Sequence, residues 1–293
     1  MGFGTRNMRH GRLLIGIGAA TCVAALAVLL IVGHHLLLQR VFGSPDVERV
    51  SPDATRPGPA HADAPGTDKA SPPEDHPVLR TLLEARSEAG IVRYGDRRSN
   101  MVALTFDDGP HPAFTTQELA VLDRYGVKAT FFVVGTMAQK YPDSVRAIHD
   151  AGHVVGNHTW DHPTHIGGLP DIRIKAELDG CSSVIFSILG EYPSYCRTPG
   201  CNMNADVVLC AADQGMKVVL YTVNSGDYTY PGRNVILDKI LSRVRGGDII
   251  LMHDGVNQTI DILPKLIETL QSRGFELVTI EELDKAAHCP GPG

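Results

Sequence analysis

The sequence has no excess of basic residues in the part of the chain that can fold. Residues 41–293 contain 23 lysines and arginines against 33 aspartates and glutamates. A protein that binds nucleic acid presents a basic face to the phosphates. The composition therefore argues against nucleic acid as a partner, and the simplest role of the acidic balance is to keep the protein soluble.

Internal repeats and extremes of composition are also absent. No segment recurs with a period of 20–50 residues, which excludes the common solenoid architectures. Hydrophobic residues make up 43% of the chain and charged residues 20%, which excludes a wholly disordered or fibrous protein. A length of 293 residues allows one large domain or two ordinary ones.

One long hydrophobic run lies near the N-terminus. Residues 13–33 contain no charged side chain, and three arginines precede them. A helix of this length spans about 30 Å, the thickness of the hydrocarbon core of a membrane. Basic residues before a span favour a cytoplasmic N-terminus. We expect residues 1–12 to be a basic cytoplasmic tail and residues 13–38 to be an uncleaved single-pass anchor, with the rest outside the cell. A signal peptide that is cleaved from a secreted protein is the alternative.

The composition changes after the hydrophobic run. Eight of the 19 prolines fall in residues 44–77, where large aliphatic side chains are scarce. Such a segment buries too little apolar surface to fold. We expect a disordered linker at 39–77, a short lead-in helix within 78–98 and a folded domain at 99–288.

The cysteines form no CxxC pair, so a zinc-thiolate site is not expected. Five of the six cysteines follow residue 40, on the expected outer side of the membrane, where disulfides are permitted. Because five is an odd number, at least one has no partner within the chain. Cys196 with Cys201 and Cys181 with Cys210 are candidate pairs, Cys289 is the fifth, and the sequence does not choose between them.

From residue 101 onward, short apolar runs alternate with helical patterns. The expected strands are 101–106, 129–135, 153–156, 195–198, 217–223, 248–253 and 276–280. The expected helices are 115–125, 137–151, 171–189, 205–214, 233–245 and 259–273. This alternation predicts an α/β fold with a parallel sheet, either doubly wound or closed into a barrel. In both architectures the reactive side chains gather at the C-terminal ends of the strands.

Two adjacent carboxylates, Asp107 and Asp108, follow the first expected strand. Released from the strand by a Gly-Pro pair, they point in different directions from one loop. One of them can bind a metal ion while its neighbour holds a proton. An acidic surface turn has the same pattern.

A histidine pair follows another expected strand. His158 and His162 are four residues apart, so a helical turn would present both imidazoles on one face, as in many zinc sites. Thr159 stands where the HExxH motif of zinc proteases has its glutamate, so that reading lacks its general base. Together with an acid from another strand, the pair makes a two-histidine, one-carboxylate set with open coordination positions. His165 is expected to support this set or to lie on the surface.

Further polar residues stand at the ends of other expected strands. They are Arg197 in RTPG, Asp227 and Tyr228 in SGDYTYPG, and His253 in LMHD. In this order, TFDDG, HTWDH, RTPG, DY and LMHD resemble the five motifs of the polysaccharide deacetylases, which form carbohydrate esterase family four and share the NodB homology domain. The resemblance covers residues 99–288. It implies a distorted (β/α) barrel with a metal ion in a groove at its top.

The resemblance also implies roles for the motif residues. Asp108, His158 and His162 match the metal ligands, with Zn²⁺ as the most common ion and Co²⁺ or Ni²⁺ as alternatives. Asp107 matches the catalytic base, and His253 matches the general acid that protonates the departing amine.

The remaining motif residues match supporting roles. Arg197 corresponds to the residue that orients the base, and Asp227 to the partner of the acid. The backbone N–H of Gly200 corresponds to the oxyanion donor, and Tyr228 to a residue that contacts the substrate. The chain departs from the family pattern in two motifs. In the third, Gly200 and Cys201 stand where an aromatic residue and then a glycine are usual. In the fourth, Tyr228 stands where tryptophan is usual, and Asn224 stands where an acid is common.

The resemblance implies a hydrolase that removes acetyl groups from the N-acetylated sugars of a cell-envelope polysaccharide, such as peptidoglycan or a chitin-like chain, and releases acetate. An O-acetyl esterase on xylan or a similar glycan is one alternative. An inactive sugar-binding domain is another, and the departures in the third and fourth motifs favour it. No protein partner is expected.

Overall fold

The structure, a computed structural model, describes residues 90–288. The expected tail, anchor and linker, the helix expected before residue 90, and Cys289 all lie outside these residues. Within residues 90–288, no helix is both long and apolar enough to cross a membrane.

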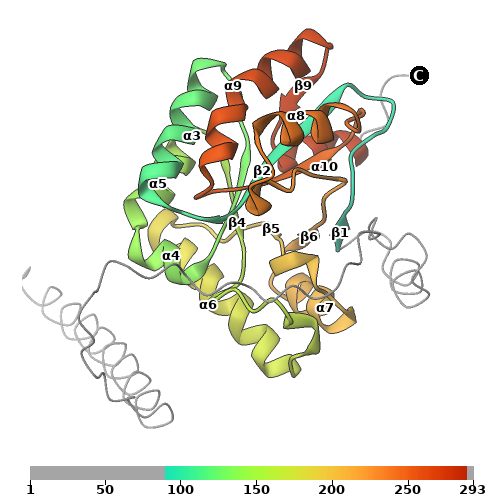
Figure 1. The fold of residues 1–293 in the computed structure, drawn as a ribbon. Coiled ribbons are helices and arrows are strands. Elements are labelled where there is room, and N and C mark those ends of the chain that lie inside the picture. The colour runs from blue at the N-terminus through green and yellow to red at the C-terminus, as the bar shows by residue number, and fades with distance from the viewer. Residues whose placement is uncertain (1–89, 289–293) are drawn as a thin grey trace, which may run out of the picture. The chain divides into compact units, whose positions relative to one another are not determined.

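The core of the domain is one sheet of nine parallel strands (Figure 1). The strands are β1 (Ile91–Val92), β2 (Met101–Gly109), β3 (Thr130–Val133), β4 (Val154–Asn157), β5 (Tyr195–Cys196), β6 (Lys217–Val219), β7 (Val223–Asn224), β8 (Ile249–His253) and β9 (Glu276–Val278). Their order is β1-β6-β5-β4-β3-β2-β8-β7, and β9 also pairs with β2. Because the two end strands of this order, β1 and β7, do not pair with each other, the sheet is a curled half-barrel. This confirms the expected α/β, distorted (β/α) barrel.

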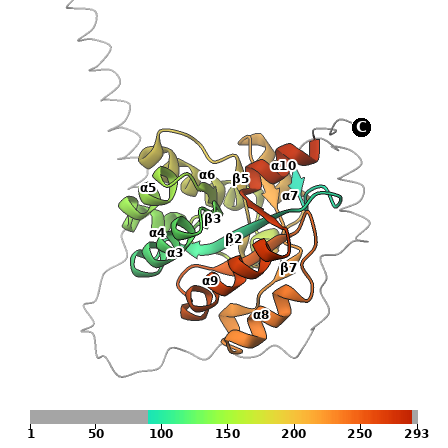
Figure 2. The same ribbon diagram turned by 90° about the horizontal axis from the view of Figure 1, so that it is seen from above.

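Helices surround the sheet, and Figure 2 shows β2 crossing the middle of the domain among them. They are α3 (Pro112–Arg124), α4 (Gly135–Lys140), α5 (Pro142–Asp150), α6 (Asp171–Leu189), α7 (Ala205–Asp213), α8 (Arg233–Leu241), α9 (Asn257–Ser272) and α10 (Ile280–His288). Short 3-10 turns lie at Ile166–Gly168 (η1), Pro199–Cys201 (η2) and Asp227–Thr229 (η3).

The central strand β2 shows how the sequence separates the packing face from the reactive face. Side chains alternate across a strand. Val102, Leu104 and Phe106 pack in the main hydrophobic cluster with residues of the surrounding helices. The alternate residues Thr105 and Asp107 are buried on the interior face. The barrel interior is therefore polar near the C-terminal end of the strand.

The opposite end of the barrel interior is apolar. Ala103 of β2 and Ile249 of β8 form a second buried cluster with Ile280 and Leu283 of α10. Helix α10 thus closes the N-terminal end of the half-barrel. The polar end stays open for the candidate site.

Several elements differ from the sequence-based expectation. The helix expected at 137–151 is two helices, because Pro142 has no backbone N–H to donate and starts α5 after the non-helical Tyr141. The strand expected at 217–223 is also two, because the Leu220 N–H pairs with β1 and the Thr222 N–H pairs with β8. Strand β1 lies within the segment assigned to the lead-in and pairs with β6.

The candidate disulfides are not formed. Cys181, Cys196, Cys201 and Cys210 are all free thiols. Cys181 turns into the core, where its thiol donates to the Val133 carbonyl at 3.2 Å. Burial raises the pKa of Cys181 and of Cys196 to about 12, so both thiols stay protonated and unreactive at neutral pH.

Candidate active site

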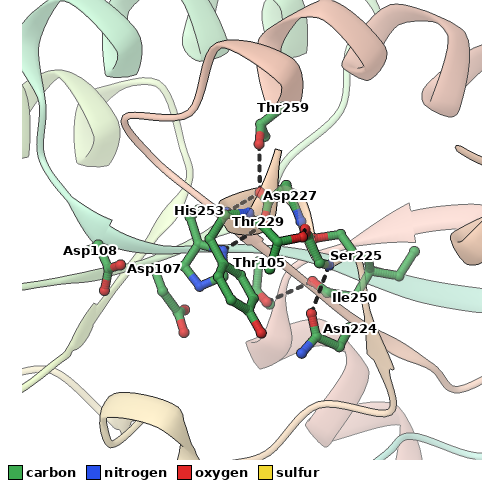
Figure 3. A network of polar contacts seen from close by, with 12 residues as sticks. Thr105, Asp107, Asp108, Asn224, Ser225, Asp227, Thr229, Ile250, His253 and Thr259 are labelled. Carbon is green, nitrogen blue, oxygen red and sulfur yellow. Dashed lines mark hydrogen bonds and ion pairs between the residues drawn. The ribbon is translucent and has the colours of Figure 1, made fainter. Parts of the chain in front are cut away.

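The motif residues converge at the C-terminal end of the half-barrel. Asp107 and His253 are direct neighbours across β2 and β8. Figure 3 shows Asp107 and Asp108 on one side of His253 and Asp227 on the other. Residues that are far apart in the sequence therefore form one site, as the strand-end rule predicts.

The two aspartates owe their different directions to an irregularity in β2. The register with β3 shifts between Phe106 and Gly109, and Asp108 has a left-handed backbone with φ of 73°. A bulge of this kind redirects side chains next to active sites. We expected both aspartates to lie in a loop after residue 106. This expectation is wrong, because β2 continues through both of them.

The histidine pair is not helical, so this part of the expectation is also wrong. Residues 158–162 form a loop in which Thr159 and His162 have φ of 68° and 65°. The Thr159 N–H donates to the Asn157 side chain at 2.7 Å. The N–H groups of the next two residues both donate to buried Glu177 of α6. These contacts bring the two imidazoles together, with ring centroids 5.1 Å apart.

Asp108, His158 and His162 have the geometry of a metal site. The distance from Asp108 Oδ1 to His158 Nε2 is 3.2 Å, and to His162 Nε2 it is 3.0 Å. With bonds of about 2.0–2.1 Å, neighbouring ligands of a tetrahedral zinc ion lie about 3.3 Å apart. Within the described residues, this is the group of three His, Cys, Asp or Glu side chains whose ligand atoms all lie within 4.8 Å of one another. The residues present therefore fit a divalent cation.

Surrounding groups prepare these ligands. His158 Nδ1 lies 2.7 Å from the Arg197 carbonyl, so it donates there and leaves Nε2 as the ligand atom. Burial alone would raise the pKa of Asp108, but hydrogen bonds and charge from His158 and His162 outweigh it and hold the pKa well below its ordinary value. Asp108 is therefore ionised, as a metal ligand must be.

Arg197 is almost completely buried, with 1% exposure. Its Nη1 donates to Asp107 Oδ1 at 2.8 Å and to Thr105 Oγ1 at 2.7 Å. Its other nitrogens donate to the carbonyls of Val219 and Leu220. The guanidinium also lies over the ring of Phe132. Arg197 thus fixes the Asp107 carboxylate in position from a strand on the other side of the barrel interior.

His253 is held by Asp227. His253 Nδ1 lies 2.7 Å from Asp227 Oδ1, so Nδ1 donates and Nε2 faces the site. Asp227 Oδ2 accepts the His253 backbone N–H and the Thr259 hydroxyl. Burial alone would lower the pKa of His253, but the hydrogen bond and charge of Asp227 outweigh it and raise the pKa. The arrangement favours a protonated imidazole, which can act as an acid.

The proposed substrate contacts lie at the rim. Gly200 is exposed in η2 and has a left-handed backbone with φ of 60°. The exposed Tyr228 ring stands edge-on to His253, with centroids 5.2 Å apart. A groove of about 720 Å³ is lined by residues from the segments 230–235, which include Tyr230, and 257–261.

Two residues singled out in the sequence lie away from the chemistry. His165 is exposed and precedes η1, so the surface reading holds. Asn224 accepts the Gly226 N–H at 2.8 Å and shapes the turn before Asp227.

The sequence reading missed Thr105 and Thr259. Thr105 lies two residues before Asp107 and therefore on the same face of the strand, which was a usable signal. Thr259 reaches Asp227 from helix α9, and no local pattern in the sequence indicates that contact.

Comparison with known proteins supports one family. The sequence model described as polysaccharide deacetylase matches residues 94–219, which include the first three motifs. The peptidoglycan-N-acetylglucosamine deacetylase of Bacillus cereus is 34% identical over 218 residues, covering 72% of this chain and 100% of that protein. The chitooligosaccharide deacetylase of a Bradyrhizobium species is 34% identical over 206 residues, covering 65% and 94%.

A solved structure shows the same fold. The crystal structure of a CE4 family pseudoenzyme from Bacillus anthracis superposes with a TM-score of 0.64 at 26% identity, covering 67% of this chain and 69% of that one. Matches over the full length of a relative at this level of identity establish the family as well as the fold. The chain belongs to the polysaccharide deacetylases of carbohydrate esterase family four.

Proposed function

We propose that this chain is a metal-dependent hydrolase that removes acetyl groups from the N-acetylated sugars of a cell-envelope polysaccharide and releases acetate. The observation that carries the proposal is the meeting of three units at one end of the barrel. These are the ligand set of Asp108 and the two histidines, the Asp107–Arg197 pair, and the His253–Asp227 pair.

Enzymes of this family are metal-dependent, and Asp108, His158 and His162 would hold the ion. We propose Zn²⁺, because two imidazoles and one carboxylate are a typical ligand set for a catalytic zinc ion. When bound, such an ion polarises the acetyl carbonyl and makes water more acidic.

The protein's own groups then divide the work on the amide. Asp107 accepts the proton of the attacking water, and Arg197 keeps the carboxylate aimed at it. The Gly200 N–H donates to the oxygen that becomes negative in the tetrahedral intermediate. His253 Nε2 gives its proton to the sugar nitrogen as the C–N bond breaks. The products are acetate and a free amine.

The rim of the site supports a polymeric substrate. Tyr228 and Tyr230 are both more than half exposed, at 53% and 56%, and the groove at Tyr230 lies open to solvent along the N-terminal ends of α8 and α9. Exposed tyrosines offer an apolar face together with a hydroxyl. A sugar chain, which has both apolar and polar faces, matches such a surface.

The N-terminal sequence supports a location at the cell surface. We propose that residues 13–38 anchor the protein in the cell membrane with the catalytic domain outside, where cell-envelope polysaccharide is found. The run of uncharged residues and the preceding arginines support this orientation. No protein partner is needed for the chemistry described.

A second candidate is an inactive sugar-binding domain. It is favoured by the similarity to a pseudoenzyme of the same fold and by Gly200, which stands where an aromatic residue is usual in the family. The presence of the base, the acid and the full ligand set argues against it. An O-acetyl esterase would use the same groups on an ester.

One assay separates these candidates. Acetate release is measured from N-acetylated chitooligosaccharides, peptidoglycan and acetylxylan, with the Zn²⁺-loaded protein and with protein treated with a chelator. We expect release from an N-acetylated substrate that chelation abolishes and Zn²⁺ restores. The Asp107→Asn variant, loaded with the same metal, is the matched control and should be nearly inactive.

The other outcomes are equally informative. Release from acetylxylan alone would identify an O-acetyl esterase. Binding of an oligosaccharide without any acetate release would identify a sugar-binding domain and would overturn the proposal.

A further inference from the structure

Asp254 lies directly behind the turn that follows the two aspartates. Its side chain has no exposed surface. Asp254 Oδ2 accepts hydrogen bonds from the Thr115 hydroxyl and, at 3.2 Å, from the His111 backbone N–H. A Cβ placed on Gly109 would lie only 2.3 Å from the same oxygen. The carboxylate is therefore packed against the backbone of the turn, and only glycine fits at position 109.

The same carboxylate caps helix α3 from another part of the chain. His111 occupies the N-cap position but makes no side-chain cap. Asp254 accepts the backbone N–H of this N-cap residue, as the acid of a capping box does, and shares it with the Thr115 hydroxyl oxygen. It also places a negative charge at the positive end of the helix dipole. The start of α3 is thus tied to the end of β8.

Asp254 also contacts the catalytic groups through its backbone. It directly follows His253, and its N–H donates to the Asp107 carbonyl at 2.9 Å. The adjacent Asp108 is held in a left-handed backbone with φ of 73°. A non-glycine residue keeps this conformation only when its surroundings enforce it. The buried side chain of Asp254 contacts the turn that follows Asp108, at Gly109 and His111.

Glu118 is a second buried acid whose charge would interact with that of Asp254. The contacts of the two side chains indicate which of them is ionised. Glu118, on α3 one turn after Thr115, has 0% exposure, and neither of its oxygens has a hydrogen-bond partner among residues 90–288. Burial, followed by the charges of Asp254 and Asp227, raises the pKa of Glu118 well above its ordinary value. Burial raises the pKa of Asp254 as well, but hydrogen bonds from the Thr115 hydroxyl and the His111 N–H oppose this effect. Within residues 90–288 no group donates to Glu118. The hydrogen bonds therefore favour the proton on Glu118 and the negative charge on Asp254.

We propose that Asp254 is a positioning residue that couples the strand of the general acid to the end of β2, which carries the base and the metal ligand. Its carboxylate locks residues 109–111 against α3 and so holds Asp108 in its metal-binding conformation. The catalytic consequence rests on the proposed function, whereas the effect on metal binding does not depend on which substrate is cleaved.

The first test measures the Kd for Zn²⁺ and the kinetics of acetate release for Asp254→Asn. Loss of an outer partner of a metal site costs about 10- to 100-fold in metal affinity or activity. We expect the Kd for Zn²⁺ to rise about 10-fold and kcat to fall at saturating Zn²⁺. KM should change little, because Asp254 is buried and touches no exposed surface of the groove.

Asp248→Asn is the matched control. Asp248 is a buried aspartate with 3% exposure that immediately precedes the same strand, at the end opposite the catalytic groups. It accepts the Arg245 N–H at 2.6 Å and pairs with Arg97. Its substitution should lower the Tm while the Kd for Zn²⁺ stays at the wild-type value.

A second set of variants tests the same contact if Asp254→Asn folds poorly. Thr115→Val removes the hydroxyl that donates to Asp254 and should also raise the Kd for Zn²⁺, whereas Thr115→Ser keeps the hydroxyl and should restore it. Thr116→Val is the control on the exposed side of α3, since the Thr116 hydroxyl bonds only to the Pro112 carbonyl within the helix.

A wild-type Kd for Zn²⁺ in Asp254→Asn, or in Thr115→Val when the first variant does not fold, would overturn the proposal. A similar rise in Asp248→Asn would do the same, because it would show a general loss of stability. If the wild-type protein releases no acetate from any substrate, the proposed function fails. The comparison of Zn²⁺ affinities still decides the role of Asp254.

Discussion

Asp107 and Asp108 are chemically identical neighbours, and the backbone alone gives them different surroundings. Asp107 faces the buried guanidinium of Arg197, whereas Asp108 faces His158 and His162. The bulge at the end of β2 is the physical cause of this division. It lets one residue of the pair point into the barrel while the next points along its rim.

The division predicts that the two asparagine substitutions fail in different ways. Asp107→Asn removes the proton acceptor but leaves the ligands, so kcat should fall about 10²- to 10⁴-fold while Zn²⁺ stays bound. Asp108→Asn replaces a charged ligand with a neutral one, so the Kd for Zn²⁺ should rise first. Excess metal should then restore part of the activity. Bound zinc and turnover are measured on the same preparations.

The reverse pattern would show that the roles are exchanged. In that case Asp107→Asn would lose the metal and Asp108→Asn would keep it. His162→Ala provides an independent check, because it should lose the metal without unfolding the protein.

The pKa of His253 predicts the alkaline side of the pH profile. Burial would lower this pKa, but Asp227 raises it above its ordinary value, which is about 6.5. Only the protonated imidazole can donate to the amine, so kcat/KM should fall as the pH rises through this pKa. In Asp227→Asn the pKa drops, and we expect the alkaline limb to move to lower pH together with a loss of kcat.

Glu118→Gln is the matched control for the pH profile. Glu118 lies near enough to Asp227 for their charges to interact, but we infer that it is already neutral. Its amide analogue should therefore leave the alkaline limb in place. A limb displaced to lower pH in this variant would show that Glu118 carries a charge that supports the acid.

At the scale of single elements, the sequence predicted the existence of most strands and helices but not their connections. The helix expected at 171–189 matches α6, because its pattern is long and its αL cap at Gly190 is a strong stop signal. Strand β1 was missed, since two residues carry no recognisable period. The break within 217–223 was also missed, because it depends on which neighbouring strand each residue pairs with.

One missed element had a readable signal. Helix α10 begins with a capping box, in which the Thr279 N–H donates to Glu282 Oε2 at 2.8 Å and the Glu282 N–H donates to Thr279 Oγ1 at 3.2 Å. The spacing T-x-x-E is visible in the sequence. The loop at 158–162 had no such signal, because its shape depends on Glu177 of a different helix.

Arg197 connects four strands, and this predicts a large effect on stability. It extends from the end of β5 to side chains of β2, to the ring of Phe132 in β3 and to carbonyls at the end of β6. Arg197→Met leaves Asp107 buried without its partner, which costs about 3–5 kcal/mol in the free energy of unfolding. Urea unfolding measures this difference.

Arg233→Met is the control for this comparison. Arg233 pairs with Asp261 at 2.8 Å, but its side chain is 66% exposed. An exposed pair contributes about 0–1 kcal/mol. Equal losses in the two variants would contradict the view that burial of the Arg197–Asp107 pair sets its importance.

At the scale of the whole molecule, the family motifs predicted the candidate site residues, and the fold explains why these residues meet. Parallel strands place every C-terminal end at one end of the barrel, so five motifs spread between residues 105 and 254 converge without any further rule. The residues that support them could not be identified in the same way. Thr259 and Asp254 act through contacts between α9, α3 and β8 that only the assembled fold defines.

The arrangement of the whole chain predicts how the protein behaves on living cells. The arginines at 6, 9 and 12 precede the apolar run at 13–33, and the proline-rich segment at 44–77 separates this run from the catalytic domain. If the run is an anchor with a cytoplasmic N-terminus, the domain lies outside the membrane, and protease added to intact cells should release it by cutting within 39–77. A cytoplasmic protein of the same cells should remain intact and is the control. Antibodies against an N-terminal tag and against the domain distinguish the products, because the tag should stay with the membrane fraction.

A domain that is found uncut in the culture medium without its N-terminal segment would instead indicate a cleaved signal peptide. A domain that is degraded only after lysis would reverse the orientation, and would place the active site away from the polysaccharide that we propose it modifies.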